Sequence, residues 1–234
     1  MTYIDKFNAE DVTEKFPALW NLLTPEEHRL MVSSLQFRSY KKYEYIYRVG
    51  ESPDSLLFLL SGKVKIFCDG VGGRSQIMRM MSAGQYFGYR AFLAREPYVT
   101  AAAAFEPTTL GLIPMTVVSR VMEHNNQVCR FFISELATDL GIADRRTVSL
   151  TQKHVRGRLA ESLLFLLETY GKETGSGNLK IHLSREDLAN LSNMTTSNAI
   201  RTLSAFSAEG LIALDGRDIR ILDEPALDHI SRMG

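Results

Sequence analysis

Residues 184–212 of this 234-residue chain read SREDLANLSNMTTSNAIRTLSAFSAEGLI. Ser184 can cap a helix, and the acidic residues that follow it suit a first helical turn. A second helix is predicted from Thr195, and its inward-facing residues are Ala199, Leu203 and Phe206. Ala189 is small enough for two helices to cross closely, and Asn193 tolerates the positive φ of a tight turn. The stretch therefore predicts a helix-turn-helix.

The outward face of the second predicted helix is polar and carries Thr196, Ser197 and Arg201. An arginine can place two donors on guanine O6 and N7, and short hydroxyls can reach phosphates or base edges. A hairpin around Asp215-Gly216, which we expect to turn as type I′, would form a wing beside this helix. Two helices joined by a short turn are more often plain helix packing than a DNA-reading motif, so the pattern alone does not establish DNA binding.

The composition narrows the class of protein. Hydrophobic residues make up 45% and charged residues 23% of the chain, which suits one large domain or two small ones. Lys+Arg and Asp+Glu both number 27, which excludes a wholly basic nucleic-acid coat. Any DNA affinity must therefore come from local placement of Arg185, Arg201 and helix N-termini. With 16 Gly, 7 Pro and 2 Cys, the chain is not collagen-like, disordered or a disulfide scaffold.

The cysteines and the N-terminal sequence bear on location. Cys68 and Cys129 lie far apart and belong to no metal-binding motif, which suits a reducing compartment. Residues 1–16 carry no basic stretch followed by an apolar one, and no apolar run approaches the roughly 18 residues of a membrane span. We expect a cytoplasmic protein that makes no membrane contact.

The spacing of apolar residues changes twice in the sequence that precedes the helix-turn-helix. A helix is predicted within residues 22–35, with Thr24 as its N-cap. Residues 37–113 form short alternating runs broken by glycines, which predicts a small antiparallel barrel or roll. Helical periodicity returns near Pro114, first in a short helix and then in a long one over residues 125–150.

Apolar and small residues recur along the long predicted helix at alternating steps of four and three. They are Cys129, Ile133, Leu136, Leu140, Ala143, Thr147 and Leu150. Such a seam suits a helix that packs along its twin, although a single helix facing its own core gives the same spacing. The length and narrowness of the seam favour dimerisation.

Five motifs are spread over most of the chain: VGE (49–51), LLSGKV (59–64), AGQYFG (83–88), VRGRLA (155–160) and LSREDLA (183–189). In these motifs and their order the chain resembles the Crp/Fnr family of bacterial transcription regulators. The resemblance implies an α+β fold with an N-terminal antiparallel β-roll, double-stranded jelly-roll-like and flanked by helices, a long dimerisation helix and a C-terminal winged helix-turn-helix. We expect an effector domain at 1–124, a dimerisation helix and hinge at 125–152, and a DNA-binding domain at 153–234.

The resemblance also implies partners and contacts. A homodimer would bind double-stranded DNA and act with RNA polymerase. Ser184 and Arg185 match the phosphate-contacting start of the first helix, while Thr195 and Arg201 match a phosphate contact and a guanine reader. Thr196-Ser197 stands at the variable pair that reads bases and lacks the Arg-Glu or x-Glu of the best-known members. The DNA site should therefore differ from theirs.

The effector pocket departs from the pattern of cyclic-AMP binders, which read Phe-Gly-Glu-Leu and then Arg-Ser. In this chain Tyr89 stands at the position of the glutamate and Val99 at that of the arginine. A buried phosphate without a guanidinium costs several kcal/mol. We therefore do not expect cyclic AMP to bind in the usual mode, and the effector is unknown. The candidate pocket residues are Tyr86, Gly88, Tyr89, Arg90, Val99, Thr100, Ala143 and Asp144.

Other functions of similar folds find little support. No cysteine precedes Cys68, which excludes an oxygen-sensing cysteine cluster, and none of the five histidines lies in residues 37–113, which argues against a metal-dependent enzyme of the cupin type. No catalytic or nucleotide-binding fingerprint occurs, so we predict neither an enzyme nor a metal site. Two alternatives stay open: a regulator that depends on haem, with His124 a conceivable ligand, or on another small ligand, and a signalling dimer that binds protein instead of DNA.

Overall fold

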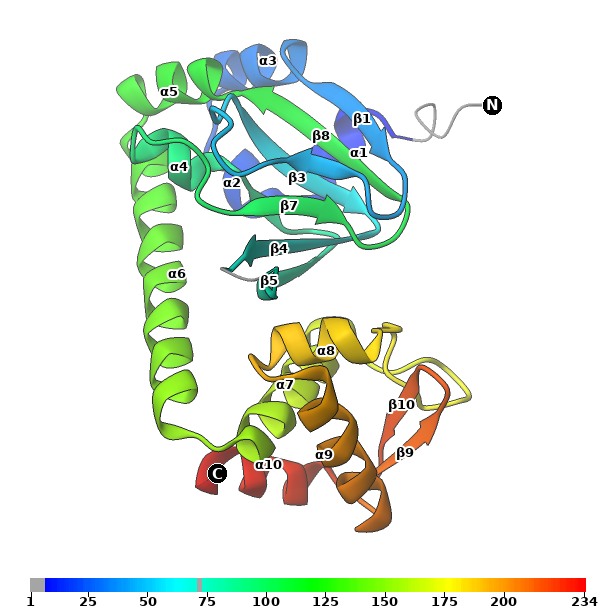
Figure 1. Ribbon diagram of the computed structural model, residues 1–234. Coiled ribbons are helices and arrows are strands. Elements are labelled where there is room, and N and C mark those ends of the chain that lie inside the picture. Colours follow the sequence, from blue (N-terminus) through cyan, green and yellow to red (C-terminus); the bar gives the residue numbers. More distant parts are fainter. Residues whose placement is uncertain (1–6, 71–72) are drawn as a thin grey trace. The chain divides into compact units, whose positions relative to one another are not determined.

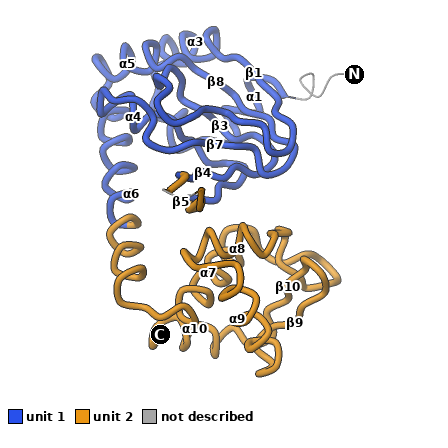
Figure 2. The backbone as a smooth tube through the Cα atoms, viewed as in Figure 1, with its two compact units in different colours: residues 1–68, 79–141 blue, residues 69–78, 142–234 orange. Residues whose placement is uncertain are grey.

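The computed structural model describes residues 7–70 and 73–234. The chain divides into two compact units, one of residues 1–68 and 79–141 and the other of residues 69–78 and 142–234 (Figure 2). This division falls inside the long helix. The three-part boundaries expected from the sequence stay a prediction, and each unit is described separately below.

The first unit is built around two four-stranded sheets, although the first residues of β5 belong to the segment 69–78 of the second unit (Figure 1). One has the order β1-β8-β3-β6 and the other β2-β7-β4-β5. Neighbours such as β1 and β8, β3 and β8, and β4 and β7 pair antiparallel, so the predicted antiparallel roll is confirmed. The strands are β1 (Gln36–Tyr40), β2 (Tyr45–Tyr47), β3 (Ser55–Ser61), β4 (Lys63–Asp69), β5 (Ser75–Ser82), β6 (Tyr86–Phe87), β7 (Ala101–Ala104) and β8 (Thr108–Pro114).

Residues 56–60 of β3 are all apolar and buried, because both faces of the strand are covered. Leu57 and Leu59 belong to a cluster inside the roll with Val64, Phe87 and Leu110. The alternate residues of the strand, Leu56, Phe58 and Leu60, belong to a second cluster against the flanking helices. A strand buried on two sides loses the polar alternation of a half-exposed one. It therefore lies at the centre of the first unit.

The helices of the first unit pack on the outer side of this strand. They are α1 (Ala9–Lys15), α2 (Pro17–Trp20), α3 (Pro25–Ser33), α4 (Tyr89–Leu93), α5 (Met115–His124) and the start of α6 (Asn126–Gln152). The predicted cap of α3 is confirmed, because Thr24 Oγ1 accepts from the amide of Glu27 and the Glu27 carboxylate accepts from the amide of Thr24. Helices α1 and α2 were not predicted, since each is too short to show a periodic apolar pattern.

The second unit contains four helices among its described residues 153–234, which pack together, and a hairpin. Its elements are α7 (Val155–Tyr170), α8 (Arg185–Leu191), α9 (Thr196–Ala208), β9 (Ile212–Asp215), β10 (Asp218–Ile221) and α10 (Glu224–Met233). Helix α10, which follows the hairpin and packs on α7, was not predicted. The predicted type I′ turn is wrong in type and position. Gly216 and Arg217 form the turn, and of the two only Gly216 has a positive φ, as at the first central position of a type II′ turn.

Gly62, between β3 and β4, gives a stability prediction. Its φ is +87°, and a Cβ there would lie 2.5 Å from the carbonyl oxygen of Pro107 and 2.5 Å from Thr108 Oγ1. We expect Gly62→Ala to lower the free energy of unfolding by about 3 kcal/mol, from backbone strain and overpacking together. Gly84→Ala is the matched control, since Gly84 has a φ of +92° but open space around it, and it should cost about 1 kcal/mol.

Urea denaturation followed by the fluorescence of Trp20 measures this difference. Trp20 is the single tryptophan of the chain and lies buried in the core of the first unit, so its signal reports the unfolding of the roll. Equal losses in the two variants would show that the close approach at Gly62 is not what requires a glycine.

Candidate functional site

Helix α8 begins at a fixed cap. Ser184 Oγ accepts a hydrogen bond from the amide of Asp187 at 2.9 Å and donates to Asp187 Oδ2 at 2.7 Å. Asp187 is buried, so this pair anchors the start of the helix. The sequence signal for a helix start at Ser184 is confirmed. The Ser184 hydroxyl makes hydrogen bonds within this cap, and its contact with a DNA phosphate stays a prediction.

The turn between α8 and α9 has the conformation that the sequence suggests. Asn193 has a φ of +49°, and the amide of Met194 donates to the carbonyl of Ala189 at 3.0 Å. Arg158 of α7 braces the turn, because its guanidinium donates to the carbonyls of Ser192 at 3.1 Å and Asn193 at 3.2 Å. Arg158, the second arginine of the VRGRLA motif, therefore stabilises the turn of the helix-turn-helix.

Helix α9 presents a polar face to solvent. Thr195 caps the helix through a hydrogen bond from the amide of Asn198 at 3.2 Å, and Arg201 Nη2 donates to Asn198 Oδ1 at 2.5 Å. The inward residues are the three predicted, and all are buried: Ala199, Leu203 and Phe206. The exposed residues of the outer side are Thr196, Ser197, Ile200, Arg201 and Ser204. Three predicted DNA-contact residues thus share this side, and the fourth, Thr195, is exposed at the N-cap of the helix.

Arg185 lies against the hairpin. Its Nη2 donates to the carbonyl of Gly216 at 2.7 Å, and its Nη1 is buried without a hydrogen-bond partner among the described residues. The guanidinium therefore ties the first turn of α8 to the β9–β10 turn. This contact was not predicted, because its acceptor is a backbone carbonyl distant in sequence.

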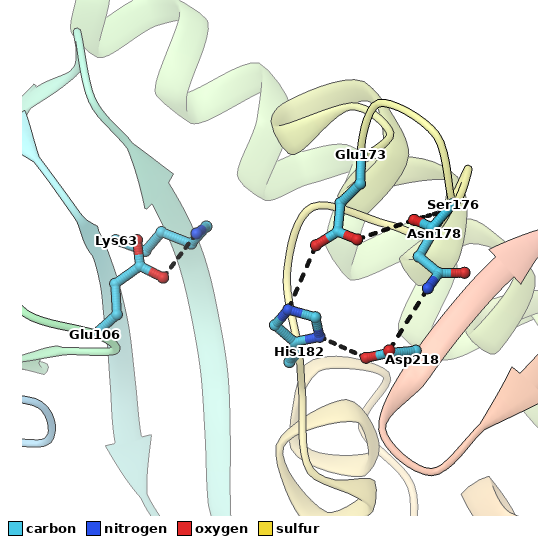
Figure 3. Close-up of polar contacts among 7 residues, drawn as sticks. All are labelled: Lys63, Glu106, Glu173, Ser176, Asn178, His182 and Asp218. Atoms are coloured by element: carbon cyan, nitrogen blue, oxygen red, sulfur yellow. Dashed lines mark hydrogen bonds and ion pairs between the residues drawn. The ribbon is translucent and has the colours of Figure 1, made fainter.

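The same end of the hairpin is also held by a polar cluster around His182, because Asp218 directly follows the turn (Figure 3). His182 Nδ1 lies 2.6 Å from Asp218 Oδ1 on β10, and its Nε2 lies 3.5 Å from Glu173 Oε1. Asn178 donates to the second oxygen of Asp218 at 3.5 Å, and Ser176 donates to Glu173 at 2.9 Å. The loop before α8 and the hairpin are thereby joined on the side that also carries Arg185.

The predicted effector residues fall into separate groups. Tyr89, at the start of α4, is buried, and its ring centroid lies 5.1 Å from that of Phe132 on α6. Its hydroxyl lies 3.5 Å from Asp139 Oδ2, which Arg79 pairs with at 2.9 Å. Burial, and next the negative charge of Asp139, raise the pKa of Tyr89 above its ordinary value. Tyr89 therefore links the roll to α6 directly.

Tyr86 makes a parallel link. Its ring centroid lies 5.4 Å from that of Phe131 on α6. Burial, and next a hydrogen bond to the Glu135 carboxylate, raise the pKa of its hydroxyl. Gly88, between the two tyrosines, has a φ of +95°, and a Cβ there would lie 2.8 Å from the carbonyl oxygen of Ser55. Tyr86, Gly88 and Tyr89 are thus the part of the predicted pocket that the structure brings together.

The remaining predicted effector residues point elsewhere. Arg90 is exposed and pairs with Glu96 at 2.7 Å, and Val99 is 55% exposed. Thr100 is half-buried just before β7. Ala143 and Asp144 occupy exposed positions of α6, in the second unit.

Two further tyrosines fill the roll beside Gly88. The rings of Tyr47 and Tyr98 stack at a centroid distance of 3.7 Å and an angle of 10°. The Tyr98 hydroxyl lies 3.5 Å from the carbonyl oxygen of Gly88, and burial raises the pKa of Tyr47 to about 12. A surface groove of about 490 Å³ contains none of the predicted pocket residues; its lining is Ser52, Pro53, Phe92, Arg95, Glu96, Pro97 and Ser119.

Two more observations complete the chemistry of the described residues. No group of three or more His, Cys, Asp or Glu side chains among them is arranged to hold a metal ion. Within residues 7–70 and 73–234, no helix has both the length and the apolar content needed to cross a membrane.

Comparison with known proteins identifies both parts of the chain. A model of the cyclic nucleotide-binding domain matches residues 37–125, and a model of the Crp-like helix-turn-helix domain matches residues 157–230. The chain belongs to the Crp/Fnr family of transcription regulators. As a Crp/Fnr regulator it carries a DNA-binding helix-turn-helix and is a transcription regulator, not an enzyme.

Named relatives match 80–91% of the Crp/Fnr chain. The Cyclic AMP receptor protein of Thermus thermophilus is 27% identical over 91% of this chain and 96% of its own length. The Transcriptional regulator LdrP of the same species is 28% identical over 82% and 94%. The Transcriptional activator protein anr of Pseudomonas aeruginosa is 24% identical over 80% and 76%.

Solved structures agree on the fold of this Crp/Fnr regulator. FixK2 from Bradyrhizobium japonicum has a TM-score of 0.76 at 23% identity, over 84% of this chain and 96% of its own. TTHB099, a CRP-family transcriptional regulator from Thermus thermophilus, has a TM-score of 0.70 at 26% identity, over 83% and 96%. The predicted fold class is confirmed.

Several residues that shape the site of the Crp/Fnr regulator were missed by sequence reasoning. On α9 these are Asn198, which holds Arg201, and Ile200, which is exposed beside it. On α6 they follow a second stripe next to the seam: Val128, Phe132, Glu135 and Asp139. That stripe also repeats at steps of four and three, so the sequence held a signal for a helix with two occupied faces.

Proposed function

We propose that this Crp/Fnr regulator acts as a homodimer that binds a two-fold symmetric site in double-stranded DNA. The observation that carries the proposal is the exposed polar face of α9, capped at Thr195 and backed by a buried apolar face. In such a dimer the two α9 helices enter successive major grooves about 34 Å apart. Arg201 reads a guanine, Thr196 and Ser197 contact neighbouring base edges, and Thr195 and Ser184 contact phosphates.

The proposed dimer rests on the exposed side of α6, which runs for 27 residues. Leu136 packs on the helical core of the first unit, but Ile133 is 65% and Leu140 64% exposed. Ala143 and Thr147 on the same seam are exposed as well. Large apolar side chains recurring on one side of a long helix are the pattern that a twin helix buries. We therefore assign residues 125–152 to dimerisation and retain 1–124 and 153–234 as the proposed effector and DNA-binding parts.

Arg185 takes a role in this proposal that differs from the one expected. Because its guanidinium already binds the Gly216 carbonyl, it positions the wing beside α8. Its Nη1 is buried, so it is not offered to a phosphate that approaches the same face. In this proposal Arg185 therefore serves the DNA interface by positioning the wing.

The proposed effector chemistry excludes cyclic AMP in the mode usual for the family. The position of the ribose-binding carboxylate is taken by Tyr89, which is buried against α6. Arg90, the nearest candidate for the missing phosphate partner, is paired with Glu96 at the surface. The Tyr47–Tyr98 stack fills the roll beside Gly88. A charged phosphate placed there would be desolvated without a counter-charge.

Two further parts of the proposal concern partners and place. We expect contact with RNA polymerase, because several curated relatives are named transcriptional activators, and an activator acts on the polymerase. We also expect action in the cytoplasm, where bacterial DNA is found.

The DNA-binding part of the proposal is tested by selection from a library of random-sequence duplexes. The expected result is a palindromic consensus whose half-sites lie about one helical turn apart. Binding that is equally tight to every duplex at physiological salt would reject sequence-specific regulation.

A prediction about the effector follows. Cyclic AMP at millimolar concentration should give no heat of binding in calorimetry and should leave the affinity for the selected duplex unchanged, because the roll offers no site for the phosphate. The Cyclic AMP receptor protein of Thermus thermophilus is the positive control. Saturable binding of cyclic AMP to the roll would show that the tyrosines give way and that this part of the proposal is wrong.

A further inference from the structure

Ile200 is an apolar side chain on the polar face of α9. It is 46% exposed, although its neighbours one turn before and after, Thr196 and Ser204, are polar. Residues four apart lie on the same side of a helix, so these three form one line along the helix surface. Ile200 stands in the middle of that line and next to Arg201.

Ile200 does not belong to the buried face of α9. That face consists of Ala199, Leu203 and Phe206, which are buried in the second unit. A β-branched residue at an exposed helix position also lowers helix propensity slightly compared with the polar residues common there. The position therefore suits contact with a partner better than it suits water.

The major groove of DNA presents one apolar group, the C5-methyl of thymine. We propose that Ile200 contacts a thymine methyl in each half-site and so determines sequence preference at that base pair. The inference rests on the proposed function, in which α9 enters the major groove. It adds an apolar contact to the polar contacts of Arg201, Thr196 and Ser197.

The neighbouring Arg201 indicates which base pair of the half-site carries that thymine. The guanidinium of Arg201 is held by Asn198 Oδ1 at 2.5 Å, which limits the directions in which it can donate. Consecutive residues on a helix reach neighbouring parts of the groove. The thymine recognised by Ile200 should therefore lie beside the guanine recognised by Arg201.

Deoxyuridine gives a direct test, because uracil differs from thymine only by the absent methyl group. The probe is a duplex from the random-sequence selection, in which each thymine is replaced in turn by deoxyuridine. Fluorescence anisotropy measures the affinity of the full-length protein. At one thymine per half-site the replacement should weaken binding by roughly fourfold, the value of one buried methyl group.

Variants connect this loss to the side chain. Ile200→Ala should bind the thymine and deoxyuridine duplexes equally, whereas Ile200→Val should retain most of the discrimination. Leu222→Ala is the matched control, since Leu222 is a similarly exposed apolar residue (52%) outside α9, and it should discriminate as the unaltered protein does. Ile200 is exposed, so none of these changes should affect folding, which thermal unfolding checks.

The outcomes separate this inference from the function on which it rests. If no thymine is sensitive to replacement, or if Ile200→Ala keeps the same sensitivity, the inference is wrong while sequence-specific binding stands. Failure to bind any duplex would overturn the proposed function and the inference with it.

Discussion

Leu140→Glu should convert the protein from a dimer to a monomer at micromolar concentration. In the proposed dimer the two copies of this side chain face each other across the α6 seam. The substitution removes two buried leucines and leaves two like charges in an apolar contact. The cost is on the order of 5 kcal/mol, which corresponds to a several-thousand-fold rise in the dissociation constant of the dimer.

Sedimentation velocity of the purified variants measures the effect. Leu222→Glu is the control, because it places the same charge at a comparably exposed apolar position away from α6. The roll should stay folded in the monomer, since Leu140 is exposed and outside its core, and the fluorescence of Trp20 reports this. If Leu140→Glu sediments as the unaltered protein does, α6 is not the dimer interface.

The loss of the dimer should also weaken DNA binding. A monomer engages one half-site, so it loses the gain from linking two recognition helices at a fixed spacing. The variant should therefore bind a duplex with one half-site as well as the unaltered subunit does, and lose its preference for the palindrome.

Local sequence signals predict the elements that carry function. Ser184 and Thr195 cap their helices, Asn193 takes the positive φ of the turn, and Ala199 and Phe206 are buried as expected. Each of these features depends on residues within a few positions of one another. That is why periodicity and capping preferences suffice to predict them.

Contacts between distant residues escape such reasoning. The stacked rings of Tyr47 and Tyr98 are 51 positions apart by their numbers, and nothing near either residue indicates the pair. Arg185 binds a backbone carbonyl at Gly216, an acceptor that every residue carries and that sequence cannot single out. The type of the hairpin turn was missed for a related reason, since the two strands set the register and with it which residues form the turn.

In the effector region, sequence comparison identifies a local difference but does not reveal a contact between distant residues. Sequence comparison places a tyrosine where cyclic-AMP binders have a carboxylate, because that comparison needs only alignment of a short motif. It does not show that Tyr89 reaches Asp139 and Phe132 on α6, 43 or more positions along the chain. The direct link between roll and helix follows only from the folded structure.

Arg201→Ala should lower the affinity for the selected duplex by roughly a hundredfold or more. A bidentate arginine–guanine contact contributes about 1–3 kcal/mol, and the dimer makes it twice. The affinity for random-sequence DNA should change little, because that binding depends on phosphate contacts. Arg232→Ala is the control, since Arg232 is an exposed arginine of the same domain that lies on α10 and pairs with Asp228 at 2.8 Å.

Chemical substitution of the base tests the contact itself. Replacing the recognised guanine with 7-deazaguanine removes the N7 acceptor but keeps base pairing, so it should weaken the unaltered protein and leave Arg201→Ala unaffected. If 7-deazaguanine lowers the affinity of Arg201→Ala and of the unaltered protein by the same factor, another residue reads that guanine. Because Asn198 holds Arg201 in place, Asn198→Ala should lose part of the same discrimination while retaining the arginine. A different result would make the asparagine the base-reading residue. In that case Asn198→Ala would lose all of the discrimination, and the unaltered protein would not respond to 7-deazaguanine.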